Sequence, residues 1–178
     1  MKLNFENFKN NSIIEIAKSI ALAAKTAPKA RGRDTLEIII VTNDEIKQIS
    51  EKMIFISERD GKSFFKRDAE NILQASAIIL IGTTYKSLGL DCGWCGYSSC
   101  NEKDKNISSP CIFNLNDLGI AIGSIVSLAA DYRIDNRVMF SIGKAAIELN
   151  FFSDDIKAAF GIPLSATNKN PFFDRKPI

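Results

Sequence analysis

Apolar residues follow two patterns along the chain. In some segments they recur every three or four positions, as in a helix, and in others they form short continuous runs, as in a buried strand. Segments of the two kinds alternate. Segment 12–27 opens with a Ser-x-x-Glu capping box and repeats apolar residues every three or four positions. It predicts a helix that ends before Pro28, because proline disfavours helical backbone in the residue that precedes it. Short apolar, largely β-branched runs predict buried strands at 36–41, 77–82 and 156–164.

Helical spacing between these runs predicts further helices, and the charged stretch 59–68 predicts a loop. The expected helices cover 42–55, 68–74, 117–131 and 138–149. The tail 165–178 is polar, and its Phe172 and Phe173 have no evident core to join. Short strands among dominant helices indicate an α/β or α+β protein.

The composition fits one domain covering residues 1–178. The chain has 178 residues, of which 46% are hydrophobic, enough for a sizeable core. Its 23 basic and 21 acidic residues nearly cancel, so charge indicates neither a nucleic-acid partner nor a membrane partner. The first eleven residues hold no apolar signal region, and no apolar run approaches the ~20 residues of a membrane span. We therefore expect a cytoplasmic protein with reduced thiols.

The sequence contains no histidine. Ser-His-Asp and Cys-His catalysis, histidine-type zinc sites and Rieske clusters are therefore excluded. Proton transfer would have to use other side chains, water or a cofactor. The sequence identifies no catalytic residue and no substrate.

The candidate chemistry lies in the irregular segment 87–115, which holds every cysteine in a C-x2-C-x4-C-x10-C pattern. Four thiolates that converge on one centre are the ligand set of a [4Fe–4S] cluster. Gly93 and Gly96 allow positive φ angles and can expose amide groups toward cluster sulfurs. The predicted ligands are Cys92, Cys95, Cys100 and Cys111.

Three other interpretations of the cysteines remain open. Disulfides conflict with a reducing compartment. Structural zinc would more often show two C-x-x-C pairs, and the second pair is missing here. Four unrelated core cysteines would rarely gather in one glycine-rich loop. The spacing favours the iron–sulfur interpretation.

The segment CGWCGYSSC resembles the C-G-x-C-G-x-x-x-C motif of four-iron domains in electron-transfer subunits and corrinoid iron–sulfur proteins. A wider resemblance joins the chain to an uncharacterised family of bacterial and archaeal ferredoxin-domain proteins. It rests on segments 117–124, 134–139, 141–144 and 161–166, and on the distance from the third cysteine to the fourth. That resemblance implies the cluster but no substrate.

The chain also resembles FMN-dependent nitroreductases. The A-A-x-x-A-P segment at 23–28, the D-x-G-x-A helix at 117–130 and the G-I-P strand end at 161–163 follow their order. The resemblance implies a nitroreductase-like three-layer α+β fold that carries the cysteine-rich iron–sulfur loop. It also implies a homodimer with FMN at its interface.

Nitroreductases usually bind the flavin phosphate with arginines near the start of the chain. The corresponding residues 4–12 contain no arginine here, so the phosphate lacks these partners. Arg31 and Arg33 in the loop after Pro28 are the nearest substitutes, because arginine suits bidentate phosphate contacts. Solvated surface charges are the competing interpretation. In the tail, Lys169 and Arg175 are similar in place to basic residues that nitroreductases use on the phosphate.

Other residues allow two interpretations each. Trp94 and Tyr97 would shield the cluster or form a docking surface, and Asp117 would cap a helix or contact a cofactor. Gly123 and Gly143 lie within helical patterns and would mark close helix packing or the approach of a flat ligand.

Two functional hypotheses follow. In the first, the protein is an FMN-dependent oxidoreductase in which the cluster feeds electrons to the flavin, which reduces a small-molecule acceptor. In the second, it is a flavin-free iron–sulfur carrier or redox sensor that acts through a partner protein.

Overall fold

The structure, a computed structural model, describes residues 2–173 of the chain. Its α-helices are α1 (Phe5–Thr26), α2 (Asn43–Asp60), α3 (Ser63–Ile72), α4 (Cys100–Asp104), α5 (Ile112–Asp131) and α6 (Phe140–Glu148). Its strands are β1 (Leu36–Val41), β2 (Ala77–Thr84), β3 (Asp135–Asn136) and β4 (Ile156–Ser165). Two short 3-10 helices are η1 (Ala30–Gly32) and η2 (Pro171–Phe173).

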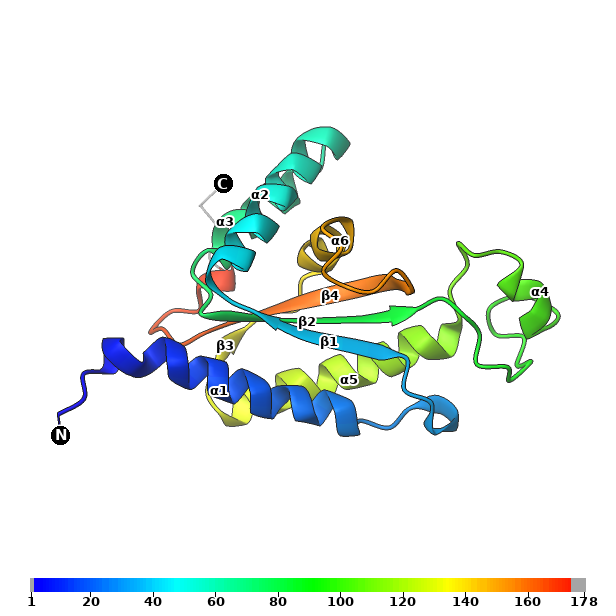
Figure 1. The fold of residues 1–178 in the computed structure, drawn as a ribbon, viewed down its shortest axis with the longest axis horizontal. Coiled ribbons are helices and arrows are strands. Elements are labelled where there is room, and N and C mark those ends of the chain that lie inside the picture. Colours follow the sequence, from blue (N-terminus) through cyan, green and yellow to red (C-terminus); the bar gives the residue numbers. More distant parts are fainter. Residues whose placement is uncertain (1, 174–178) are drawn as a thin grey trace.

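The described strands form one antiparallel sheet in the order β1-β2-β4-β3. Strand β2 lies in the middle, and its side chains alternate between the two faces. Ile79 and Ile81 pack with α1 and α5 on one face, while Ile78 and Leu80 pack with α2, α3 and α6 on the other. The result is a helix–sheet–helix sandwich with an apolar core on each side of the sheet, as Figure 1 shows.

Two glycines bring α6 into backbone contact with β4. A Cβ atom on Gly143 would lie 1.9 Å from the carbonyl oxygen of Ala159, and one on Gly161 would lie 2.1 Å from Cγ2 of Ile142. Gly143 therefore marks close packing of a helix on a strand rather than the approach of a flat ligand. Gly123 differs, because a Cβ there would meet nothing within 4 Å.

The three expected strands are confirmed, whereas several helix limits were wrong. Helix α1 begins before the capping box, at Phe5, where the Asn4 side chain accepts a hydrogen bond from the amide of Glu6 at 3.1 Å. The expected loop 59–68 is mostly helix. Only Gly61, at φ 66°, and Lys62 separate α2 from α3, and the charges of α3 lie around a buried Phe65.

The tail also differs from expectation. Phe172 is fully buried in this chain's own core, next to α3, so the expectation that it lacks a core role was wrong. Phe173 is 56% exposed, and the guanidinium of Arg137 lies 5.0 Å from the centre of its ring. Arg175 lies outside the described residues.

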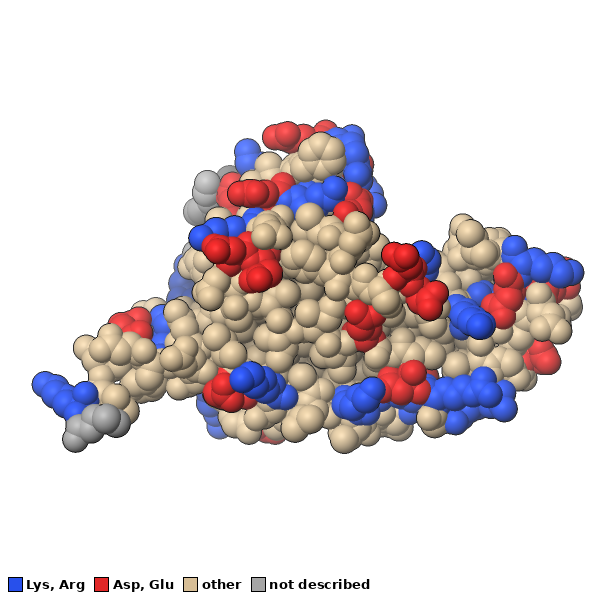
Figure 2. Space-filling view, viewed as in Figure 1, with Lys and Arg blue, Asp and Glu red and all other residues tan. Residues whose placement is uncertain are grey.

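Helix α5 is, among the described helices, the one long and apolar enough to cross a membrane by length and composition. Its most apolar window has a mean hydropathy of 1.5. In this fold α5 packs on α1 and β2 and places its Asn114 and Asp117 side chains in the interior. Across the face drawn in Figure 2, basic and acidic side chains are largely interspersed.

Candidate metal centre

The cysteines lie in a lobe, residues 85–111, that joins β2 to α5 and projects beyond one end of the sheet (Figure 1). The amide of Cys111 donates to the carbonyl oxygen of Tyr85 at 3.2 Å. We call the sheet with its covering helices the frame. This hydrogen bond closes the neck of the lobe, which is the pair of points at which the chain leaves and re-enters the frame. At its base, the lobe is thus closed by a hydrogen bond between two backbone groups.

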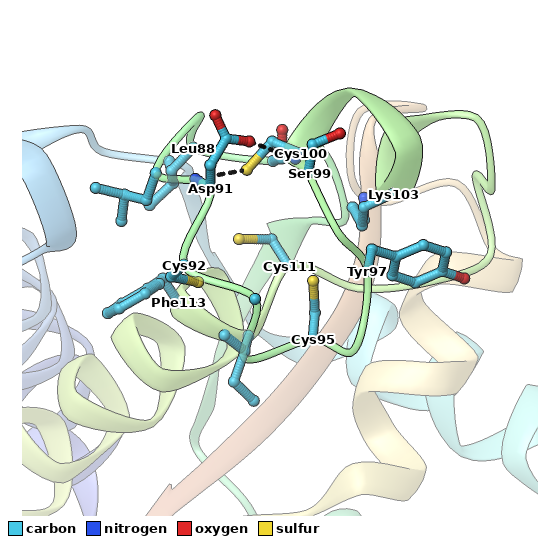
Figure 3. A pocket seen from close by; sticks show the side chains of 14 residues that line it. Leu88, Asp91, Cys92, Cys95, Tyr97, Ser99, Cys100, Lys103, Cys111 and Phe113 are labelled. Atoms are coloured by element: carbon cyan, nitrogen blue, oxygen red, sulfur yellow. Dashed lines mark hydrogen bonds between the residues drawn. The ribbon is translucent and has the colours of Figure 1, made fainter.

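All four thiols line one pocket inside the lobe. Figure 3 shows the cysteine side chains arranged around this common space, together with Leu88, Asp91, Tyr97 and Lys103. Cys111 is buried, with 7% of its surface exposed, and the other three cysteines are half-buried. One short segment of the chain thereby supplies a partly enclosed, sulfur-lined site, which is what the cysteine spacing predicts.

The spacing of these thiols bears on the kind of metal. Within residues 2–173, no three side chains of the metal-binding types are grouped tightly enough to hold one ion. A [4Fe–4S] cluster does not need such a group, since each thiolate binds a different iron and inorganic sulfide fills the centre. A single tetrahedral zinc would instead need four ligand atoms that touch one ion.

A tight turn presents the first two thiols. Gly93 and Gly96 have φ angles of 71° and 85°, and the amide of Gly96 donates to the carbonyl oxygen of Gly93 at 3.0 Å. A residue with a side chain rarely adopts such angles, so glycine is needed at both positions. The Gly96 amide is therefore used inside the turn, contrary to the expectation that it is free to donate to a cluster sulfur.

The third thiol belongs to the first residue of α4. Ser99 caps this short helix, and its hydroxyl accepts from the amide of Glu102 at 3.2 Å. The amide of Cys100 donates to the carboxylate of Asp91 at 2.6 Å, and the amide of Asp91 donates to Sγ of Cys100 at 3.3 Å. Both hydrogen bonds are drawn in Figure 3.

A buried ammonium group fixes α4 to the neck. Lys103 is 2% exposed, lines the cysteine pocket, and donates to the carbonyl oxygen of Tyr85 and to the carboxylate of Asp104. The same carboxylate accepts from the amide and the hydroxyl of Ser87 at 2.9 and 2.7 Å. Burial alone would raise the pKa of Asp104, but the hydrogen bonds from Ser87 and Lys103 together hold it below its ordinary value.

Asn114 supports the neck from α5 and was not singled out from the sequence. Its side-chain amide donates to the carbonyl oxygens of Thr84 and Lys86 at 2.9 and 2.8 Å. Its own oxygen is buried and has no hydrogen-bond partner within the described residues. Asparagine in the first turns of an apolar helix, here Asn114 and Asn116, is the signal that could have indicated this role, because a buried amide needs partners.

Arg31 and Arg33 are not merely solvated charges, since they hold the lobe. Nη1 of Arg31 donates to the carbonyl oxygens of Leu88 and Gly89 at 2.9 and 3.2 Å, and Nη1 of Arg33 reaches Leu88 at 3.4 Å. Basic side chains gather beside η1 and the lobe in Figure 2. Each guanidinium has further donors, so both arginines can also meet an anion.

The other predicted phosphate residue, Lys169, follows β4, and the preceding residues Ala166, Thr167 and Asn168 lie beside the start of α1, the end of that helix farther from η1. The 22 residues of α1 separate the two places by about 33 Å. Beside Lys169 in sequence is a polar hollow of about 460 Å³, lined by Phe5, Glu6, Lys9, Arg133, Ala166, Thr167 and Asn168. Within one chain, therefore, the arginines and Lys169 belong to two separate places.

The lobe's aromatic residues divide between inside and outside. Tyr97 lines the cysteine pocket, and its hydroxyl accepts from the side chain of Asn106 at 2.9 Å. Trp94 is 74% exposed and stacks on Phe113, with ring centres 5.4 Å apart. Asp117, expected as a helix cap, is instead the sixth residue of α5 and buried.

Comparison with known proteins identifies the family of this chain. A family model described as "Uncharacterized protein containing a ferredoxin domain (DUF2148)" matches residues 108–175, which include Cys111. An uncharacterized protein of Archaeoglobus fulgidus is 42% identical over 185 residues, which cover 99% of each chain. The chain belongs to this ferredoxin-domain family. The expected family resemblance is thereby confirmed.

Solved structures resemble the ferredoxin-domain protein in fold. A nitroreductase with bound FMN from Desulfitobacterium hafniense superposes with a TM-score of 0.60 at 19% identity, over 87% of this chain and 78% of that one. A nitroreductase from Lactococcus lactis in complex with nicotinic acid also gives 0.60, at 15% identity, over 89% and 79% of the two chains. The expected nitroreductase-like α+β fold is confirmed.

Proposed function

We propose that this ferredoxin-domain protein is an iron–sulfur redox protein, in which a [4Fe–4S] cluster supplies one-electron transfer to FMN on a nitroreductase-like frame. The observation that carries the proposal is the convergence of four thiols on one pocket at the end of the sheet. The nitroreductase-like fold supports the flavin part, since one of its solved relatives contains FMN.

The chain's residues have separate tasks in this proposal. Cys92, Cys95, Cys100 and Cys111 hold the cluster. Lys103 places a buried positive charge beside a dianionic centre, which offsets part of the cost of burying it. Arg31 and Arg33 anchor the lobe to η1 and offer their remaining donors to the flavin phosphate.

Anaerobic purification with iron and sulfide quantitation tests the cluster. We expect about four iron and four sulfide per chain, and a broad absorbance shoulder near ~400 nm. Stoichiometric zinc without acid-labile sulfide would contradict the proposal. Cys95→Ser should lose most of the iron, whereas Ile107→Ser, at a lobe position that is 83% exposed and outside the cysteine pocket, should keep it.

FMN titration by fluorescence quenching tests the phosphate site. Each charge-assisted contact contributes about 1.5–3 kcal/mol, so Arg31→Ala/Arg33→Ala should weaken FMN by roughly two to four orders of magnitude. A Lys18→Ala/Lys47→Ala variant removes two exposed charges elsewhere and should bind like wild type. If the arginine variant binds FMN as tightly as wild type, the phosphate site lies instead at Lys169, Arg175 and the polar hollow near Lys9 and Arg133.

A flavin-free electron carrier or sensor is the second candidate. The observation that favours it is the ring of Trp94, which is exposed beside the cysteine pocket and available to a partner protein. Wild-type protein that holds the cluster but shows no FMN binding by titration, and no flavin bands after acid precipitation, would favour this second candidate.

A further inference from the structure

We propose that Asp91 is the positioning residue of the metal centre: it fixes the direction of the Cys100 thiolate, and its charge lowers the reduction potential of the cluster. The inference rests on the proposed function. It stands on the two opposed hydrogen bonds that join Asp91 and Cys100, one to the thiol sulfur and one from the backbone amide.

These two hydrogen bonds form a closed ring, so neither residue can rotate without breaking one of them. Asp91 directly precedes Cys92, and Cys100 begins α4. The ring therefore ties the residue before the first thiol to the residue of the third thiol, nine positions apart in the chain. Within the part of the chain that the structure describes, no backbone amide donates in this way to the sulfur of Cys92, Cys95 or Cys111.

The backbone conformation of Asp91 is consistent with a positioning role. Its φ angle is 47°, in the left-handed region, where aspartate is tolerated better than most residues with a side chain. In this conformation the amide points at the Cys100 sulfur while the side chain reaches the Cys100 amide. Glycine could adopt this φ angle but has no carboxylate to accept from the Cys100 amide. Alanine disfavours the angle and also lacks the carboxylate.

The two contacts act on the potential in opposite directions. An amide that donates to a cluster sulfur stabilises the more negative, reduced state and raises the potential. A nearby carboxylate opposes the added electron and lowers the potential, although solvent screens this effect because Asp91 is exposed. Removing the charge while keeping both hydrogen bonds should therefore raise the potential.

Two substitutions separate position from charge. Asp91→Asn keeps the amide donor and one acceptor oxygen, so it should hold a full cluster at a more positive potential. Asp91→Gly keeps the φ angle but loses the acceptor, so a chelator should remove iron about tenfold faster or more than from wild type. Glu102→Gln is the matched control, because it removes one exposed negative charge from α4 without touching a cysteine.

Potentiometric titration and timed iron release provide the measurements, with the potential of Glu102→Gln as the baseline for charge. Asp91→Asn at the same potential as Glu102→Gln, or Asp91→Gly with wild-type iron release, would overturn the inference. Hydrogen exchange of the metal-free protein gives a test without the cluster. The Cys100 amide should be protected in wild type and should exchange faster in Asp91→Gly, and equal exchange would also overturn the inference.

Failure of the proposed function has a different signature. Wild-type and Glu102→Gln proteins that take up no iron on anaerobic reconstitution would overturn the iron–sulfur proposal itself. The Cys100 exchange result would still decide whether Asp91 positions this cysteine.

Discussion

The buried carboxylate of Asp117 accepts a hydrogen bond from the backbone amide of Ala30 at 2.9 Å, 87 residues away in sequence. The next residue, Arg31, donates to the carbonyl oxygens of Leu88 and Gly89. Three parts of the molecule are thus connected in series: the core helix α5, the loop around η1, and the cysteine lobe. The position of the lobe therefore depends on a residue inside the frame.

Asp117→Ala should destabilise the protein by about 1–3 kcal/mol, because the Ala30 amide loses its acceptor. Asp117→Asn keeps an acceptor oxygen and should cost less. Urea denaturation of the metal-free protein measures both. Asp131→Ala, at an exposed position near the end of the same helix, should stay within about 0.5 kcal/mol of wild type. Equal stabilities for Asp117→Ala and Asp131→Ala would contradict the role assigned to Asp117.

Gly143→Ala should be strongly destabilising, since the new methyl group would lie 1.9 Å from the backbone of β4 and α6 would have to move. Such overpacking costs about 1–3 kcal/mol or more. Gly123→Ala is the control, because the methyl group meets open space and helix propensity should favour it by up to about 1 kcal/mol. Thermal unfolding of the two variants should shift in opposite directions, and a common direction would refute the packing argument.

Acid should loosen the lobe through Asp104. Its pKa in the folded protein lies below the ordinary value, so the stabilisation is present above that value and is lost as pH falls through the folded pKa. Hydrogen exchange of residues 85–111 in the metal-free protein should therefore accelerate as pH falls from about 6 to about 3 beyond the intrinsic change, and less so in Asp104→Asn. Asp44→Asn removes a fully exposed ion pair on α2 and should leave the exchange of the lobe unchanged.

The protein should form a homodimer. The expectation comes from the resemblance to FMN-dependent nitroreductases, which implies a homodimer. Phe173 is 56% exposed and Ile120 on α5 is 38% exposed, so both apolar side chains are available to a second copy of the chain. Light scattering at micromolar concentration should give about twice the chain mass of 19.7 kDa, and a monomer mass would defeat the prediction.

Much of the frame could be predicted from the sequence, because its strands are short apolar runs that stand out from the helical segments between them. Segment 36–41 is a strand at the expected limits. The start of α1 was missed because the first turns, from Phe5, lie largely exposed and carry no apolar stripe, so only the Asn4 cap marks it. The charged stretch after Arg59 was misread because most of its polar residues face solvent, while Phe65 and Asp68 face the interior.

The convergence of the four cysteines on one pocket was predictable for a different reason, namely that cysteine spacing is a local property of the sequence. The residues that hold these cysteines in place were not predictable. Asn114 and Lys103 act through backbone carbonyl groups, and any residue can supply a carbonyl, so no sequence pattern identifies the partner. Asp117 was misassigned because the helix begins five residues earlier, at Ile112.

The single backbone hydrogen bond between Tyr85 and Cys111 has an architectural consequence. The chain leaves β2 and enters α5 at one closed point, so the segment between Tyr85 and Cys111 is an insertion with a single base. Lengthening such an insertion costs chain entropy only slowly, and it leaves strand order and register unchanged. Tyr85 and Cys111 are therefore natural cut points at which other metal-binding loops could be transplanted onto this frame.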